Sequence, residues 1–236
     1  MSHAAPRELA PFADGRLWTA WRPQRFFGIE MGTRMTVCRL SSGALWVHSP
    51  IDVGEQEAAR IRALGPVAHV VAPSRIHHLY VRDFVRHFPG AAIYGSPRLP
   101  AKRPDLSFAS VLGDAPEPGW ASDIDQCLMR GNLYLDEVVF FHRPSRTLIL
   151  ADLLEEGNAD WPLLSRVAAR LAGIYRRHAP PRDMKLMFRH DKRATRRSVE
   201  RILAWDFERI VLSHGSLVRE RGREVFRAAY EFALSW

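Results

Sequence analysis

Three short apolar runs in the sequence are each followed by residues that can bind a metal ion. These residues are His77 and His78, Asp152, and His214. Three imidazoles and one carboxylate form a ligand set that suits zinc or iron(II). Each residue alone also has an ordinary explanation, as a helix cap, a turn residue or a solvated side chain. Their shared position after a buried run favours one common site over separate coincidences.

These residues meet only if the apolar runs are strands of one α/β structure. The hydrophobic pattern predicts strands at 34–40, 44–48, 69–72, 91–94, 137–142, 147–151 and 209–213. It predicts helices at 54–64, 80–87, 163–176, 195–205 and 222–236. The alternation of strands and helices up to residue 94 predicts the α/β class, in which side chains at strand ends commonly form sites. Residues 97–118 are rich in proline, and we expect an irregular surface excursion there.

The length and composition indicate one globular domain over residues 1–236. Hydrophobic residues make up 47% of the chain and charged residues 25%, the ordinary balance of such a domain. No apolar run approaches the roughly 20 residues that cross a bilayer, and the N-terminus lacks the apolar core of a secretory signal. Cys38 and Cys127 form no close-spaced motif, which argues against a disulfide framework. We therefore expect a cytoplasmic protein with no membrane partner.

The net charge of +8 raises the question of nucleic-acid binding. Arginine is spread along the whole chain, and arginine-rich helices such as 193–201 are more often solvated faces. Nucleic acid is therefore a disfavoured partner. The sequence does not indicate the oligomeric state.

The chain resembles the metallo-β-lactamase superfamily, in an uncharacterised and degenerate branch described as a domain of unknown function. The resemblance covers about residues 35–215 and rests on Leu45-Trp46-Val47-His48-Ser49-Pro50-Ile51, Ala72-Pro73 to His77-His78-Leu79, Phe141 to Leu148, Ala151-Asp152 and Ser213-His214-Gly215. It implies an αββα sandwich with a helical insertion at about 158–193.

The hallmark loop of the superfamily reads His-x-His-x-Asp-His. When the resemblance is followed residue by residue, its last two positions fall on His77 and His78, so that His77 replaces the aspartate. The first two histidine positions fall on Pro73 and Arg75, which cannot bind a metal. The loop therefore implies the loss of two ligands of the first metal.

The remaining family positions complete the comparison. A histidine before the hairpin falls at or beside Leu133, next to Asn132, whereas the Gly-Asp becomes Ala151-Asp152 and the closing histidine is His214. The resemblance thus implies that the first metal site is lost and the second is kept. It assigns one divalent ion, with zinc favoured over iron, to His77, His78, Asp152 and His214.

The leading hypothesis is a metal-dependent hydrolase that acts on a small anionic substrate. In it Asp152 is both ligand and catalytic residue, and Arg75 binds the anionic group, although a surface salt bridge explains Arg75 equally well. One alternative is a non-catalytic or ligand-binding protein that kept the fold and lost turnover. Four protein ligands would also close a tetrahedral site, which would then hold a structural zinc. A mononuclear iron oxidoreductase is a further alternative, and whether the protein is an enzyme stays open.

Two neighbouring residues have competing interpretations. Glu137 opens a predicted strand and is a candidate to orient a ligand histidine, but an exposed position at the strand edge is favoured. Tyr80 begins a predicted helix and is a candidate to reach the site, but a place in the core is favoured.

Overall fold

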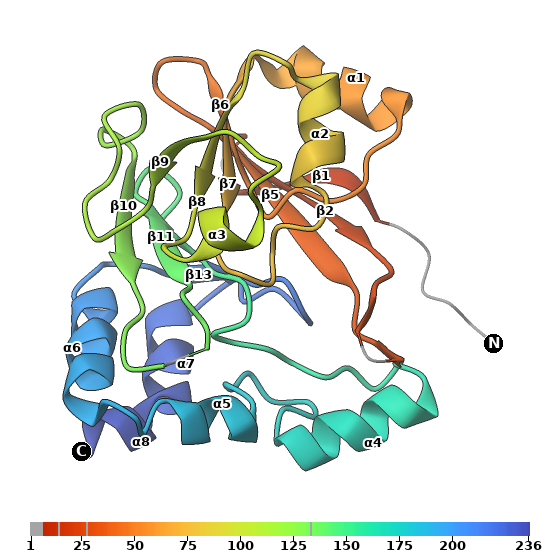
Figure 1. Ribbon diagram of the computed structural model, residues 1–236. Coiled ribbons are helices and arrows are strands. Elements are labelled where there is room, and N and C mark those ends of the chain that lie inside the picture. Colours follow the sequence, from red (N-terminus) through yellow and green to blue (C-terminus); the bar gives the residue numbers. More distant parts are fainter. Residues whose placement is uncertain (1–6, 14, 27, 133) are drawn as a thin grey trace.

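Figure 1 shows a computed structural model of the chain, which describes residues 7–13, 15–26, 28–132 and 134–236. The first sheet has the order β1 (Arg7–Ala13), β2 (Leu17–Arg22), β5 (Thr33–Arg39), β6 (Leu45–His48), β7 (Val67–Ala72), β8 (Ala92–Gly95) and β9 (Phe108–Val111). The second sheet has the order β10 (Ile124–Leu128), β11 (Val138–His142), β12 (Thr147–Ile149) and β13 (Arg209–Val211). A small hairpin joins β3 (Arg25–Phe26) to β4 (Ile29–Glu30).

Helices cover the outer faces of the two sheets. The helices that follow strands of the first sheet are α1 (Glu55–Leu64), α2 (Val81–His87) and α3 (Leu99–Lys102). The helices of the C-terminal part are α4 (Leu163–Ala172), α5 (Arg182–Met187), α6 (Lys192–Leu203), α7 (Gly222–Ala229) and α8 (Glu231–Leu234). In Figure 1, α1 and α2 lie at one end of the molecule, and α4 to α8 lie at the other.

The strands alternate their side chains between two apolar cores. Val47 of β6 packs with α1 and α2, whereas its neighbour Trp46 packs in the layer between the sheets. Phe140 of β11 joins the same central layer, and Phe141 packs on the other side with residues of α6 and α7. A strand that is buried on both faces reads as a continuous apolar run, which explains the runs in the sequence. The arrangement is helix, sheet, sheet, helix, so the prediction of an α/β fold with an αββα sandwich is confirmed.

The structure also corrects the expected elements. Residues 97–118 are not wholly irregular, because α3 and the edge strand β9 lie there. The strands β1, β2 and β10 were not among the predicted elements. The predicted closing helix is divided at Tyr230 into α7 and α8. Helices α4 and α5 lie within residues 158–193, where the sequence analysis expects a helical insertion.

Candidate metal centre

Three loops that follow strands β7, β12 and β13 converge at one place. Strands β12 and β13 are parallel neighbours, so their carboxyl ends lie at the same edge of the second sheet. Strand β7 belongs to the first sheet, but the loop after it is tied to the second sheet, because Val138 N donates to Pro73 O (2.9 Å). The site therefore takes residues from both sheets.

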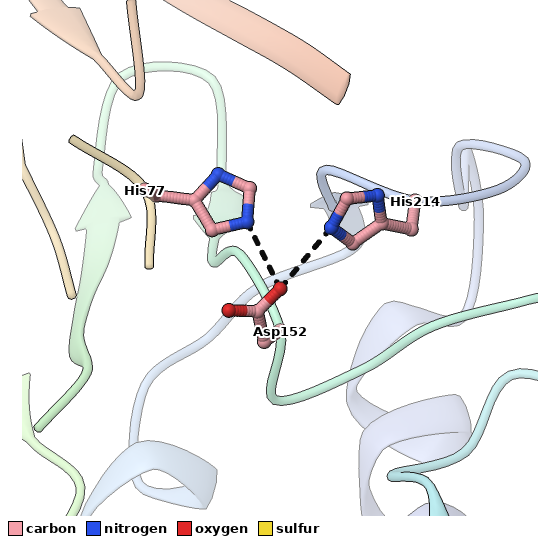
Figure 2. Close-up of side chains that lie close together, drawn as sticks. All are labelled: His77, Asp152 and His214. Carbon is pink, nitrogen blue, oxygen red and sulfur yellow. Dashed lines mark hydrogen bonds and ion pairs between the residues drawn. The ribbon is translucent and has the colours of Figure 1, made fainter. Parts of the chain in front are cut away.

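Figure 2 shows His77, Asp152 and His214 with their rings and carboxylate turned toward one another. The distance from His77 Nε2 to Asp152 Oδ1 is 2.9 Å, and from His214 Nε2 to the same oxygen it is 3.1 Å. One ligand atom from each residue lies within 4.8 Å of the others, and all three residues are buried. This is the spacing of side chains that surround a single ion.

The hydrogen bond at Nδ1 of His214 determines what its other ring nitrogen, Nε2, can do. Nδ1 of His214 lies 2.7 Å from the carbonyl oxygen of Gly32, which only accepts, so Nδ1 carries a proton. If the ring is neutral, Nε2 then carries a lone pair. This lone pair faces the carboxylate oxygen Oδ1 of Asp152. Two acceptors approach to 3.1 Å only when a proton or a cation lies between them, and a bound metal ion is one such cation. The arrangement fits a metal site, in which the second ring nitrogen of a ligand is commonly held this way.

The carboxylate of Asp152 is charged despite its burial. Burial opposes the charge, but His77 and His214 outweigh it and hold the pKa of Asp152 well below its ordinary value. Its second oxygen, Oδ2, is buried and has no hydrogen-bond partner within the described residues. An unpartnered buried oxygen beside two histidines again fits a bound cation.

Two hydroxyl groups hold the ring of His77. Nδ1 of His77 lies 2.7 Å from Ser49 Oγ and 3.4 Å from Ser213 Oγ. The backbone N–H of His77 donates to Ser74 Oγ (3.1 Å), which fixes the loop that carries the ring. These contacts direct Nε2 of His77 at Asp152.

Glu137 shapes the loop that presents Asp152. Its two carboxylate oxygens accept from Ala151 N (2.6 Å) and Asp152 N (2.9 Å). The expected exposed position at a strand edge is wrong, because Glu137 is 0% exposed. The strand end is covered by the very loop that the side chain binds, so Glu137 orients the backbone of a ligand rather than a histidine ring. Burial, together with the Asp152 carboxylate, raises the pKa of Glu137.

A buried arginine holds the loop that presents His214. Arg34 on β5 donates to Leu212 O and, at 2.9 Å, to Gly215 O. Gly215 has a φ of 110°, and a Cβ built on it would lie 2.4 Å from Glu156 O. The loop therefore requires glycine directly after the ligand candidate.

His78 lies outside the group of three. Its Nδ1 lies 2.9 Å from Arg103 Nη1, which also donates to His78 O (3.0 Å). Burial and the charges of Lys102 and Arg103 lower the pKa of His78 to about 4, so its ring is neutral at pH 7. Because the guanidinium only donates, Nδ1 accepts and the ring proton sits on Nε2. The structure thus brings together three of the four predicted ligands, and a metal role for His78 stays a prediction.

The other predicted positions are placed as follows. The guanidinium of Arg75 lies 5.9 Å from the ring centre of Tyr134, and Arg75 is not among the described residues that line the cavity beside the site. Its role in substrate binding therefore stays a prediction. Leu133 lies outside the described residues. Its neighbour Asn132 accepts from Tyr134 N (2.7 Å) and Leu135 N (3.0 Å), so it shapes a turn.

A cavity of about 440 Å³ adjoins the three residues. Its polar lining residues are Gln24, Thr33, Ser49, His77, His78, Asn132, Asp152, Glu155, Ser165, Asp183 and His214. The rest of the described lining is apolar or aromatic, and none of it is a lysine or arginine. Tyr80 also lines the cavity, where its hydroxyl donates to Gln24 Oε1 (2.5 Å), so its expected place in the core is wrong.

Glu155 is a functional candidate that the sequence analysis missed. It is buried and lines the cavity three residues after Asp152. Burial raises the pKa of Glu155 to about 8, with His214 lowering it and Asp152 raising it. Only two apolar residues, Leu153 and Leu154, precede it, and so short a pair gives no clear signal in the sequence.

Comparison with known proteins assigns the chain to a family. A family model described as a domain of unknown function, DUF4336, matches residues 14–183, which is more than half of the chain. The chain belongs to the DUF4336 family. No curated protein matches the chain. The match to a domain of unknown function that the resemblance implied is thereby confirmed.

Solved structures show the fold of this DUF4336 chain. A metallo-β-lactamase from Pontibacter korlensis has a TM-score of 0.65 at 12% identity, covering 97% of this chain and 99% of that one. The mono-zinc form of the metallo-β-lactamase FIM-1 from Pseudomonas aeruginosa has a TM-score of 0.64 at 13% identity, covering 98% and 96%. A metal-soaked flavodiiron core, Flv1 from Synechocystis sp. PCC6803, has a TM-score of 0.63 at 12% identity, covering 97% and 61%. The DUF4336 chain therefore has the metallo-β-lactamase fold.

The described DUF4336 residues include a candidate metal site of two histidines and one carboxylate at the wall of a cavity. Two imidazole nitrogens and one carboxylate oxygen are a donor set that both zinc and iron(II) accept. Each described helix falls short of the length and apolar character that a membrane crossing requires.

Proposed function

We propose that this DUF4336 protein is a metal-dependent hydrolase in which His77, Asp152 and His214 hold one divalent ion, with zinc favoured over iron. The observation that carries this proposal is the geometry of His214. Its Nδ1 is fixed by Gly32 O, and its Nε2 faces Asp152 Oδ1 at the wall of the cavity. Three protein ligands leave a fourth position for water, which is the pattern of catalytic rather than structural zinc.

A zinc ion bound there supplies a water of lowered pKa, near 7, and a Lewis acid for an acyl oxygen. The chain itself supplies the groups around that chemistry. Asp152 has a second oxygen, Oδ2, without a partner in the described part of the chain, and we assign it to orient the attacking water. Glu155 lines the same cavity with a raised pKa, and we assign it to carry the proton to the leaving group.

The cavity changes the expected substrate class. Apart from the proposed metal ion, an anionic substrate would need a cationic side chain to meet its charge, and no described lining residue is a lysine or arginine. The lining instead carries the carboxyl groups of Glu155 and Asp183 among apolar side chains. We therefore propose an uncharged, largely apolar acyl substrate, such as an ester or an amide, in place of the small anion expected from the sequence.

A mononuclear iron oxidoreductase is the second candidate. Two histidines and one carboxylate are also the facial ligand set of non-haem iron(II) oxygenases. The identity of the bound metal separates the two candidates.

The first experiment is metal analysis of the purified protein. We expect about one zinc per chain, and we expect His214→Ala to reduce the bound metal at least about tenfold. His190→Ala is the matched control, because His190 is exposed and is not among the three clustered residues. Near-stoichiometric iron would favour the oxidoreductase. Metal-free protein, with thermal stability unchanged in His214→Ala and Asp152→Ala, would reject the metal site.

The second experiment measures hydrolysis of p-nitrophenyl esters by the metal-loaded protein. Glu155→Gln should lower kcat by about 10² or more, the usual contribution of a proton-transferring side chain, while the metal content stays unchanged. Asp183→Asn is the control, because Asp183 lines the same cavity without an assigned role. Equal kcat values for the two variants would remove Glu155 from the mechanism.

A further inference from the structure

Helix α4 is packed with its large apolar side chains outward. Leu163, Leu164 and Leu171 are 68%, 64% and 70% exposed, and Val167 is 43% exposed. At about 100° per residue these four positions fall on one narrow stripe of the helix. The opposite side of the helix carries small residues, and there Ser165 and Ala169 are buried. A contiguous apolar stripe turned to solvent marks an interaction surface.

Exposed apolar side chains also lie at the cavity, which α4 helps to line. The end of α4 lies against the start of α5, where Arg182 Nη1 donates to Leu171 O (3.3 Å). Figure 1 shows the two helices along the lower edge of the view. Four residues that line the cavity are themselves exposed apolar or aromatic side chains and form its rim: Phe26, Leu79, Tyr134 and Met187.

This part of the chain also carries most of the net charge. Residues 158–193 hold nine Lys and Arg against three Asp and Glu, a net charge of +6 out of the +8 of the whole chain. Arg166 and Arg170 follow the apolar stripe around α4, and both Arg182 and Arg189 are exposed. An outward apolar face beside basic residues is the pattern of helices that lie in the interface of an anionic membrane.

We propose that the exposed face of α4, together with the start of α5 and the cavity rim, docks on an anionic lipid surface. A second copy of the chain is a poorer occupant, because it would bring two strongly basic surfaces together. Nucleic acid would meet the basic charge but leaves the leucine stripe unexplained. The sequence alone favours no membrane partner, since it lacks a spanning segment, but a helix that lies on the surface needs none.

The position of the cavity rim extends the proposal to the substrate. An acyl chain that leaves the lipid surface can enter the apolar cavity without crossing water. We infer that the substrate is an amphipathic lipid whose ester or amide bond reaches His77, Asp152 and His214. This extension rests on the proposed hydrolase function, whereas the membrane contact itself does not.

The test is co-sedimentation of the full chain with vesicles at about 150 mM salt, near the physiological screening length. We expect at least about tenfold stronger binding to phosphatidylcholine vesicles that contain phosphatidylserine than to phosphatidylcholine alone. Leu164→Ser/Leu171→Ser should weaken binding by at least about tenfold. The control is Val111→Ser, because Val111 is an exposed aliphatic residue on β9, outside the α4 face.

A charge-reversal pair completes the design. Arg170→Glu/Arg189→Glu should weaken binding to the anionic vesicles, and Arg60→Glu/Arg86→Glu on α1 and α2 should not. Binding that is unaffected by the leucine variant overturns the proposal. If vesicle binding is absent, two further results overturn the proposal. One is a dimer that the leucine variant dissociates, and the other is retardation of nucleic acid at the same salt concentration.

The metal-site variant separates this proposal from the proposed function. His214→Ala should lose metal and esterase activity and still bind vesicles. Wild-type protein that binds metal and hydrolyses esters but ignores vesicles leaves the hydrolase in place and rejects the membrane surface.

Discussion

Both ring nitrogens of His214 have defined neighbours, and this constraint is the strongest evidence for a metal site in the molecule. The Gly32 carbonyl fixes one nitrogen, and the other nitrogen is left to face the Asp152 carboxylate. A ring in this position binds a cation or a proton. In either case, two separate segments determine the chemistry of His214. These are the backbone between β4 and β5, which contains Gly32, and the loop after β13, which carries His214 itself.

Glu137 gives a prediction at the same scale. Each of its two carboxyl oxygens accepts one N–H group of the loop that presents Asp152, whereas glutamine has only one oxygen acceptor. Glu137→Gln should weaken zinc affinity by about 10-fold to 100-fold, the usual effect of losing a residue that orients a ligand. Competition with a chelator of known affinity measures this change. Glu220→Gln at an exposed position is the control, and equal affinities would show that the Glu137 contacts do not matter for the metal.

The sequence indicated which residues could form the site, but it did not indicate where each of their side chains points. His77, Asp152 and His214 could be predicted because each follows a buried run, and such runs end at the edge of a sheet. His78 is the neighbour of His77 and was expected beside it, but in the structure its ring pairs with Arg103, which comes from the loop after α3. That contact depends on tertiary packing, so no local pattern reports it. The same holds for Glu155.

At the scale of elements, the strands that are buried on both faces were the easiest to predict from the sequence. Strand β7 and strand β11 read as apolar runs, whereas β10 contains Asp125 and Gln126 and gives no such run. Its pairing with β11 makes it a strand through tertiary contact. Helix α6 begins at Lys192, earlier than expected, because the Asp191 side chain accepts from Ala194 N (2.9 Å) and caps it.

The loop after β13 gives the prediction that belongs to this scale. Gly215→Ala places a Cβ against Glu156 O in a left-handed backbone conformation. We expect a loss of about 1–3 kcal/mol in the free energy of unfolding and a weaker metal site, because the displaced loop carries His214. Urea denaturation and metal titration measure the two effects. Gly113→Ala is the control, since no atom lies within 4 Å of a Cβ built there.

At the scale of the whole molecule, a buried histidine couples stability to pH. His48 lies in the layer between the sheets, stacked on Trp46 and edge-on to Phe140. Burial and the nearby His77 lower the pKa of His48 to about 3 from 6.5, although Asp152 opposes this. The unfolded chain therefore takes up a proton that the folded chain refuses. The contribution of His48 to the free energy of unfolding is fully present above pH 6.5, and it is lost as the pH drops toward 3.

Between pH 6.5 and pH 5 this one group should cost the wild type about 2 kcal/mol of unfolding free energy. His48→Phe removes the titrating group, so its unfolding free energy should depend less on pH by that amount. Chemical denaturation at a series of pH values, with the metal content held equal, compares the two slopes. Parallel slopes would show that His48 is not the group responsible.

The tie between Pro73 O and Val138 N has a consequence for assembly of the fold. His77 arrives with the N-terminal sheet, and Asp152 and His214 arrive with the C-terminal one. An ion bound by all three would link the two sheets, and its binding free energy would stabilise their docking. Only a chain whose halves have docked correctly presents the complete ligand set. Metal loading would therefore report correct docking of the two sheets, and a misdocked chain would bind less metal.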